Sequence, residues 1–278
     1  FGNLVRPLYL FNMDQVTITH NTFHDAINDA IRLRRMTGKV IISQNHFRDI
    51  GSSSSNNTRD FIDTCHSGEE LIITDNIMDG SGCVGLDLKM DGGVYGRTAK
   101  VLVTDNIIKN CKSDGIIICG NYQIPGRFNK DMPTTPLNNY AENITIANNI
   151  ITGCGTAPAA SGNTTAAIWL KGSCRNIILA NNQIFDNAGS GVILGRHYKA
   201  AGYGIALTGN LIHNNGTASN ASQNNNVGLL VGPTFDQVTI TGNQVYNDHG
   251  NQGKNIWVWP RPDTSAIVST GNLEYQRP

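Results

Sequence analysis

The sequence predicts a right-handed parallel β-helix, in which the chain winds as a stack of triangular coils. Three observations predict it: one apolar motif recurs along the chain, an asparagine keeps the same place in every copy, and the distance between copies varies through polar insertions. A fixed unit with loops of variable length is typical of a solenoid, because each coil pairs only with its neighbours and insertions bulge outward.

The motif is apolar-x-apolar-x-x-Asn-x-apolar, and its first copy spans residues 16–23. Its period of two indicates a strand with one buried face. The asparagines of the eight regular copies are Asn21, Asn45, Asn76, Asn106, Asn149, Asn182, Asn210 and Asn243. A ninth copy ends at Asn272, where Ser269 and Glu274 interrupt the apolar face, so we expect the last coil to be irregular from about residue 255.

A second apolar pair follows each asparagine and predicts a second strand in each coil. The pairs are Ile31/Leu33, Ile62/Thr64, Leu86/Leu88, Ile116/Ile118, Ile168/Leu170, Val192/Leu194, Leu229/Val231 and Ile256/Val258. From one asparagine to the next the coils span 24 to 43 residues. A sheet of hairpins does not explain this constant pair of strands with insertions at fixed corners.

The asparagine column is expected to be structural. At a corner the backbone leaves the sheet, and its N–H and C=O groups need other partners. An inward amide can bond its own corner and the asparagine one coil above, and asparagine tolerates left-handed backbone at a turn. We therefore expect a ladder of amides inside the solenoid.

Composition limits the possible classes of protein. The net charge is zero, which argues against a nucleic-acid partner, and no apolar stretch approaches the roughly 18 residues of a membrane span. No signal peptide is visible, and the chain begins at Phe1, so we expect residues 1–278 to be a single β-helix domain from a longer chain.

The six cysteines have neither CxxC pairs nor metal-ligand spacing, so free thiols are expected, and neither a metal nor a cofactor is predicted. Cys111 and Cys154 share an offset of five residues after their ladder asparagines on adjacent coils. A disulfide between them is the alternative to two stacked thiols.

Several segments resemble known β-helix proteins. Val101–Asn106 followed by Asp114–Ile118 resembles the repeat of the pectate-lyase-like superfamily. Within that superfamily, Arg59–Asp63, Ser67-Gly68 and Gly85–Lys89 look most like bacteriophage tailspike depolymerases. The resemblance implies a homotrimeric virion or extracellular protein that binds and cuts bacterial surface polysaccharide. The paired aspartates and Gly-His-Gly of polygalacturonases and the calcium-binding nonapeptide repeat are absent from the sequence.

The outward residues of the second strands are the candidates for chemistry. Equal positions on successive coils stack about 4.8 Å apart, so Asp63 and Asp87 fall in one column on adjacent coils. Two carboxylates this close should raise the pKa of one of them, which a glycosidase needs. The predicted catalytic residues are Asp63, Asp87, Lys89, His66 and Arg32.

Two other interpretations of this charged surface remain open. In a lyase, Lys89, Arg34 or His66 would be the base, and an arginine would neutralise a uronate carboxylate. Alternatively, Arg32 with Asp63 and Asp87 with Lys89 form ion pairs that only neutralise a solvated sheet.

Rings and cations on the same side of the coil predict a glycan-binding wall, since sugars stack on aromatic rings and bind to fork-shaped donors. The predicted substrate-binding residues are Arg34, Tyr95, Arg97, Arg127, Trp169, Lys171, Arg196, His197 and Tyr198. They would suit an acidic glycan. Two further functional classes stay open: a non-catalytic glycan-binding adhesin or virion fibre, and a secreted bacterial polysaccharide lyase or epimerase.

Overall fold

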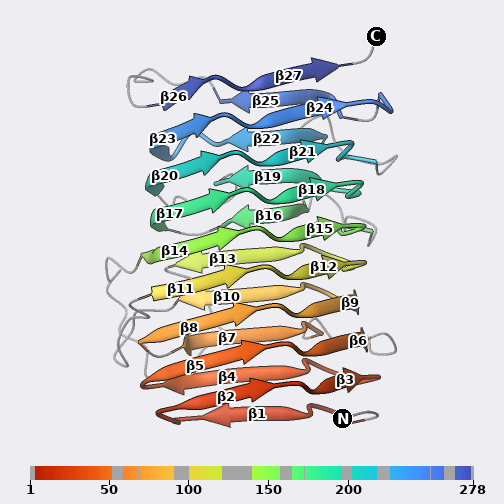
Figure 1. The fold of residues 1–278 in the computed structure, drawn as a ribbon, viewed down its shortest axis with the longest axis vertical. Coiled ribbons are helices and arrows are strands. Elements are labelled where there is room, and N and C mark those ends of the chain that lie inside the picture. The colour runs from red at the N-terminus through yellow and green to blue at the C-terminus, as the bar shows by residue number, and fades with distance from the viewer. Residues whose placement is uncertain are drawn as a thin grey trace.

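The computed structural model of the chain consists of stacked β-strands. It describes residues 4–51, 59–67, 69–90, 100–120, 140–156, 165–171, 173–195, 202–217, 226–250, 252–259 and 267–276, without the side chains of His66, Ser67, Met90 and Gln276. In these ranges 27 strands form three parallel sheets of nine strands each (Figure 1). The predicted right-handed parallel β-helix is confirmed.

The three sheets run the length of the stack. Sheet 1 contains β1 (Leu8–Phe11), β4 (Ile31–Met36), β7 (Ile62–Ser67), β10 (Leu86–Met90), β13 (Ile116–Gly120), β16 (Ala166–Leu170), β19 (Ser190–Leu194), β22 (Val227–Val231) and β25 (Lys254–Val258). Sheet 2 contains β2 (Val16–Thr19), β5 (Lys39–Ser43), β8 (Glu70–Thr74), β11 (Lys100–Thr104), β14 (Ala141–Ala147), β17 (Cys174–Ala180), β20 (Gly202–Thr208), β23 (Phe235–Thr241) and β26 (Ile267–Thr270). Sheet 3 contains β3 (Thr22–His24), β6 (His46–Ile50), β9 (Ile77–Ser81), β12 (Ile107–Lys109), β15 (Ile150–Thr152), β18 (Gln183–Phe185), β21 (Leu211–His213), β24 (Gln244–Asn247) and β27 (Leu273–Gln276).

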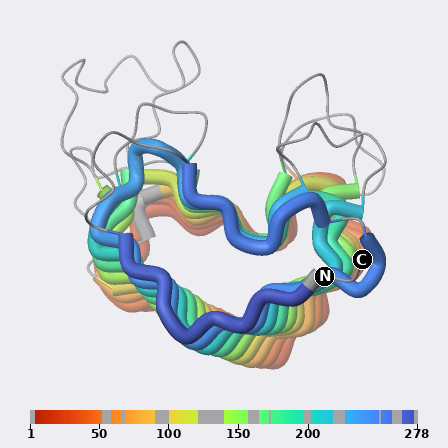
Figure 2. Tube along the Cα trace, turned by 90° about the horizontal axis from the view of Figure 1, so that it is seen from above, coloured from red at the N-terminus to blue at the C-terminus, as the bar shows by residue number. Residues whose placement is uncertain are grey.

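Each coil holds three strands, one more than the sequence pattern separates. The motif strand lies in sheet 2 and the second predicted strand in sheet 1, while the short segment directly after the ladder asparagine forms sheet 3. The ninth coil keeps the register of the others, with Ser269 opposite Ile240 and Glu274 opposite Val245. Figure 2 looks down the stack and shows sheet 1 along one long side of a flattened coil, with sheets 2 and 3 following one another along the opposite side.

The asparagine ladder forms as predicted. In a typical rung, Asn76 Nδ2 donates to the carbonyls of Thr74 and Ile42 at 2.9 Å each and to Asn106 Oδ1 at 2.9 Å. The left-handed backbone lies one residue earlier than expected, because the position before each ladder asparagine carries the positive φ, as in Asp75 and Asp105. The ladder thus fixes the corner between sheets 2 and 3 and with it the register of every coil.

A second internal ladder was not predicted. Asn187 Nδ2 donates to Asn215 Oδ1 at 2.9 Å, and Asn187 Oδ1 accepts the backbone N–H of Cys154 at 2.9 Å. Cys154 and Cys111 carry buried thiols at the matching corner of the two preceding coils. None of the six cysteines forms a disulfide bond in the structure, in agreement with the predicted thiols.

Apolar side chains from all three sheets point inward and fill the solenoid from Val16 to Val245. This continuous core holds the stack together through apolar burial. No helix in the described ranges is long and apolar enough to cross a membrane.

Candidate functional site

The outward face of sheet 1 brings together four of the five predicted catalytic residues, Arg32, Asp63, Asp87 and Lys89. The strand register places Asp63 opposite Arg32 on one side and opposite Asp87 on the other. Two residues along, Lys89 lies opposite Cys65, which in turn lies opposite Arg34. The columns deduced from the asparagine spacing are therefore correct.

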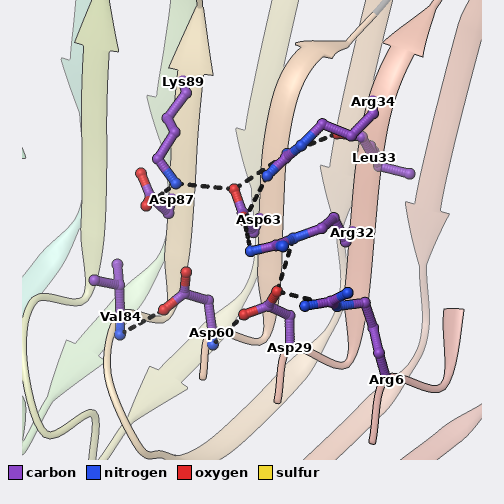
Figure 3. Close-up of polar contacts among 10 residues, drawn as sticks. All are labelled: Arg6, Asp29, Arg32, Leu33, Arg34, Asp60, Asp63, Val84, Asp87 and Lys89. Carbon is purple, nitrogen blue, oxygen red and sulfur yellow. Dashed lines mark hydrogen bonds and ion pairs between the residues drawn. The ribbon is translucent and has the colours of Figure 1, made fainter. Parts of the chain in front are cut away.

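Asp63 is the centre of this cluster, and three cations converge on it (Figure 3). Asp63 Oδ2 lies 2.6 Å from Arg32 Nη2 and 2.9 Å from Arg34 Nη2, and Oδ1 lies 3.0 Å from Lys89 Nζ. Only 1% of its side chain is exposed. A carboxylate so enclosed can position the three cations, but a substrate would reach it only by displacing one of them.

Lys89 joins the two predicted catalytic carboxylates. Its Nζ lies 3.0 Å from Asp63 Oδ1 and 2.5 Å from Asp87 Oδ2. Unlike Asp63, Asp87 keeps 14% of its side chain exposed, as does Lys89 itself. Asp87 is therefore the carboxylate of the pair that a ligand can meet directly.

Two further carboxyls of the cluster were missed by the sequence interpretation. Asp29 and Asp60 sit in the turns before β4 and β7, and both are buried. Asp29 Oδ2 lies 2.9 Å from Arg32 Nε and 3.6 Å from Arg6 Nε, and Asp29 Oδ1 accepts the backbone N–H of Asp60. Asp60 Oδ1 accepts the backbone N–H of Val84 at 3.0 Å.

The sequence contains a pattern that could have identified Asp29 and Asp60. An aspartate precedes the first inward residue of the second strand by two positions in three coils: Asp29 before Ile31, Asp60 before Ile62 and Asp114 before Ile116. In each case the side chain accepts a backbone N–H from the next coil, with Ala166 donating to Asp114 at 2.7 Å. The recurrence therefore marks a capping position at this corner.

Three of the carboxyls, those of Asp29, Asp60 and Asp63, bring oxygen atoms within 4.8 Å of one another. Such a group could hold a cation. In the structure the guanidinium of Arg32 fills that role, since it contacts both Asp29 and Asp63.

The surroundings push the pKa values of the carboxyls apart. Burial raises the pKa of Asp63, but Lys89 and then Arg34 outweigh burial and lower it to about 2. For Asp87, burial outweighs the ammonium of Lys89, and its pKa is raised.

The pKa values of Asp60 and Lys89 are also shifted by burial and by the charges around them. Burial, followed by the charges of Asp87 and Asp29, raises the pKa of Asp60 well above its ordinary value. Burial lowers the pKa of Lys89, but Asp87 and then Asp63 reverse this and raise it, so the ammonium stays charged. The cluster thus contains carboxyls whose pKa values are shifted in opposite directions, as in sites where one carboxyl acts as an acid and another as a base.

Other predicted binding residues of sheet 1 lie further along the stack. Trp169 faces outward as expected, yet it is only 3% exposed and packs with Ile193 and Leu230. Lys171 Nζ lies 4.5 Å from the centre of the Trp169 ring. The structure therefore places Trp169 in a packed apolar cluster rather than on an open platform.

The remaining predicted residues cannot be placed. The backbone of His66 belongs to β7, while its side chain lies outside the described residues. The whole of the following residues also lies outside them: Tyr95, Arg97, Arg127, Arg196, His197 and Tyr198.

Comparison with known proteins indicates the fold of the chain. No family model and no curated protein matches the sequence. The chain is similar to the A-module of the mannuronan C-5 epimerase AlgE6 of Azotobacter vinelandii, with 15% sequence identity and a TM-score of 0.56 over 93% of this chain. The A-module of AlgE4 from the same organism gives 13% identity and a TM-score of 0.40, over 95% of this chain and 78% of that one. The chain spans 58% of the AlgE6 structure, and that likeness shows a shared parallel β-helix fold.

Proposed function

We propose that this chain is an enzyme that acts on an acidic polysaccharide at the outward face of β4, β7 and β10. One observation carries the proposal: Arg32, Arg34 and Lys89 surround a buried carboxylate, yet each keeps about one seventh of its side chain exposed. Cations held in place in this way can receive the carboxylate of a sugar. The fold shared with an epimerase of mannuronan supports a polysaccharide as the substrate.

Proton transfer at the carbon next to a uronate carboxylate is the reaction that this geometry supports best. Asp87 is the base in this scheme, because it is partly exposed and its pKa is raised. Arg32 and Arg34 stabilise the negative charge that grows on the sugar carboxylate when the proton leaves. Lys89 acts as a further cation, since its raised pKa keeps it protonated. Elimination of the neighbouring sugar would make the enzyme a lyase, and return of a proton to the other face would make it an epimerase.

Hydrolysis is the second candidate. Asp63 and Asp87 are register partners whose pKa values are shifted in opposite directions, as a glycosidase requires of its two carboxyls. The enclosure of Asp63 by three cations favours the proton-transfer scheme over this one.

We place this activity in a bacteriophage tailspike, a homotrimeric virion protein that attacks bacterial surface glycan. The resemblance of residues 59–63, 67–68 and 85–89 to tailspike depolymerases supports this setting. A non-catalytic fibre that only binds glycan is the competing outcome of the experiment.

The test is incubation with acidic and neutral bacterial polysaccharides. A lyase produces the absorbance of unsaturated uronates, a hydrolase produces reducing ends without it, and an epimerase changes the proton NMR spectrum without shortening the chain. Asp87→Asn should abolish turnover, whereas Asp105→Asn, an exposed corner residue, should not change it. Binding without any product would support the fibre, and full activity of both Asp63→Asn and Asp87→Asn would exclude this site.

A further inference from the structure

Asp60 differs from the other carboxyls of the cluster in having no cation of its own. It is 3% exposed, and within the described ranges it forms no ion pair, whereas Asp29, Asp63 and Asp87 each contact at least one cation. One of its oxygens is fixed by the N–H of Val84 at 3.0 Å. Figure 3 shows its other oxygen directed toward the Asp87–Lys89 pair.

The charges of the cluster can be counted directly. Four cations, Arg6, Arg32, Arg34 and Lys89, contact the carboxyls of Asp29, Asp63 and Asp87, and the backbone N–H of Asp60 donates to Asp29, so the Asp60 carboxyl is the fourth of the cluster (Figure 3). If all four carboxyls were ionised, the charges would cancel. If Asp60 carries a proton while Asp29, Asp63 and Asp87 are ionised, the cations exceed the carboxylates by one.

The groups that face Asp60 favour its protonated form. Asp29 approaches it from the turn before β4, Asp63 from β7, and Asp87 from β10, while Lys89 of β10 is the cation that opposes them. Burial and these three carboxylates together raise its pKa well above the ordinary range of an aspartate.

We propose that Asp60 is a neutral carboxylic acid in the working site. Because Asp60 then carries no charge, the cluster has one surplus positive charge, which attracts the carboxylate of an acidic sugar. The inference rests on the proposed function and adds a positioning residue to it. Asp60 acts through Arg32, Arg34 and Lys89 and need not touch the sugar. When Asp60 loses its proton, the cluster becomes neutral and its attraction for an anionic sugar falls.

The test compares wild type with Asp60→Asn. An asparagine keeps an oxygen for the N–H of Val84 but stays neutral at every pH. Binding of galacturonate and mannuronate disaccharides, with cellobiose as the uncharged probe, is measured by calorimetry from acidic to alkaline pH. Wild type should lose about tenfold in affinity for a uronate disaccharide as the pH rises through the titration of Asp60. Asp60→Asn should keep its affinity, and Asp105→Asn, which removes a remote exposed charge, should behave as wild type does.

The outcomes separate the two hypotheses. If no uronate disaccharide binds at any pH, the proposed function fails and the inference fails with it. If uronates bind and Asp60→Asn follows the wild-type pH dependence, only the role of Asp60 is overturned. An unfolding measurement checks the protonation state without any sugar. A neutral Asp60 predicts that Asp60→Asn becomes more stable relative to wild type as the pH rises above the unfolded-state pKa of about 4, and a constant difference would overturn it.

Discussion

Asp63 and Asp87 lie opposite each other on β7 and β10, and a single ammonium, that of Lys89, contacts both carboxylates at 3.0 and 2.5 Å. Repulsion between two stacked aspartates is therefore not the main feature of this site. Lys89 holds the pair together, while the guanidinium groups of Arg32 and Arg34 on β4 add two more positive charges at Asp63. The same network of ion pairs therefore stabilises sheet 1 and forms the candidate site.

Removal of Lys89 should destabilise the fold strongly. Lys89→Met leaves the largely buried Asp87 without its cation, and breaking a buried pair on one side costs about 3–5 kcal/mol. Lys39→Met is the matched control, because its ion pair with Glu70 is more exposed, and it should cost much less stability. Urea unfolding followed by circular dichroism measures the free energy of unfolding of both variants. Equal losses of stability would contradict a structural role for the buried ion pairs of Lys89.

The asparagine ladder should be most sensitive in its middle. Asn106→Ala removes the amide hydrogen bonds to Ile73, Thr104 and Asn149 inside the stack. It also takes away the acceptor of the backbone N–H of Asn76, and a buried polar group left unpaired costs about 1–3 kcal/mol. Asn21→Ala, at the first rung, loses fewer partners in a less buried place and should cost clearly less. Thermal unfolding compares the stability of the two variants. A larger loss of stability in Asn21→Ala would show that burial of the amide hydrogen bonds does not determine what each rung contributes.

The sequence predicted those features that depend on spacing. The asparagine interval sets the register, so the ladder and the Arg32–Asp63–Asp87 column could be deduced before any coordinates. Asp29 and Asp60 were missed because they lie in turns, where alternation of inward and outward residues ends. The burial of Trp169 could not be deduced either, because the two-residue period shows that a side chain points outward and not how it packs there.

The pH dependence of stability should show two opposite contributions. The folded-state pKa of Asp63 is lowered to about 2, so its stabilisation is present above the unfolded pKa and is lost as the pH falls toward 2, by roughly 2 kcal/mol. Burial raises the pKa of Asp114 to about 6, so Asp114 costs stability as the pH rises from about 4 to 6.

Unfolding of Asp114→Asn across this range tests the second contribution. The asparagine keeps an acceptor for Ala166 and cannot ionise, so the variant should gain stability over wild type between pH 4 and 6 and keep the gain above it. A gain that appears only below pH 4 would have the opposite sign and would contradict a raised pKa.

Trp169 should behave as a core residue although it faces outward. It is 3% exposed and packs with Ile193 and Leu230, so Trp169→Ala should cost about 3–5 kcal/mol. Trp257, which stacks on Trp259 in the last coil and is only half-buried, is the matched control and should cost less. The sequence assigned Trp169 to glycan binding, and this assignment makes a different prediction. Trp169→Phe would then weaken sugar affinity more than it weakens stability, so calorimetry and urea unfolding on the same variant decide between packing and binding.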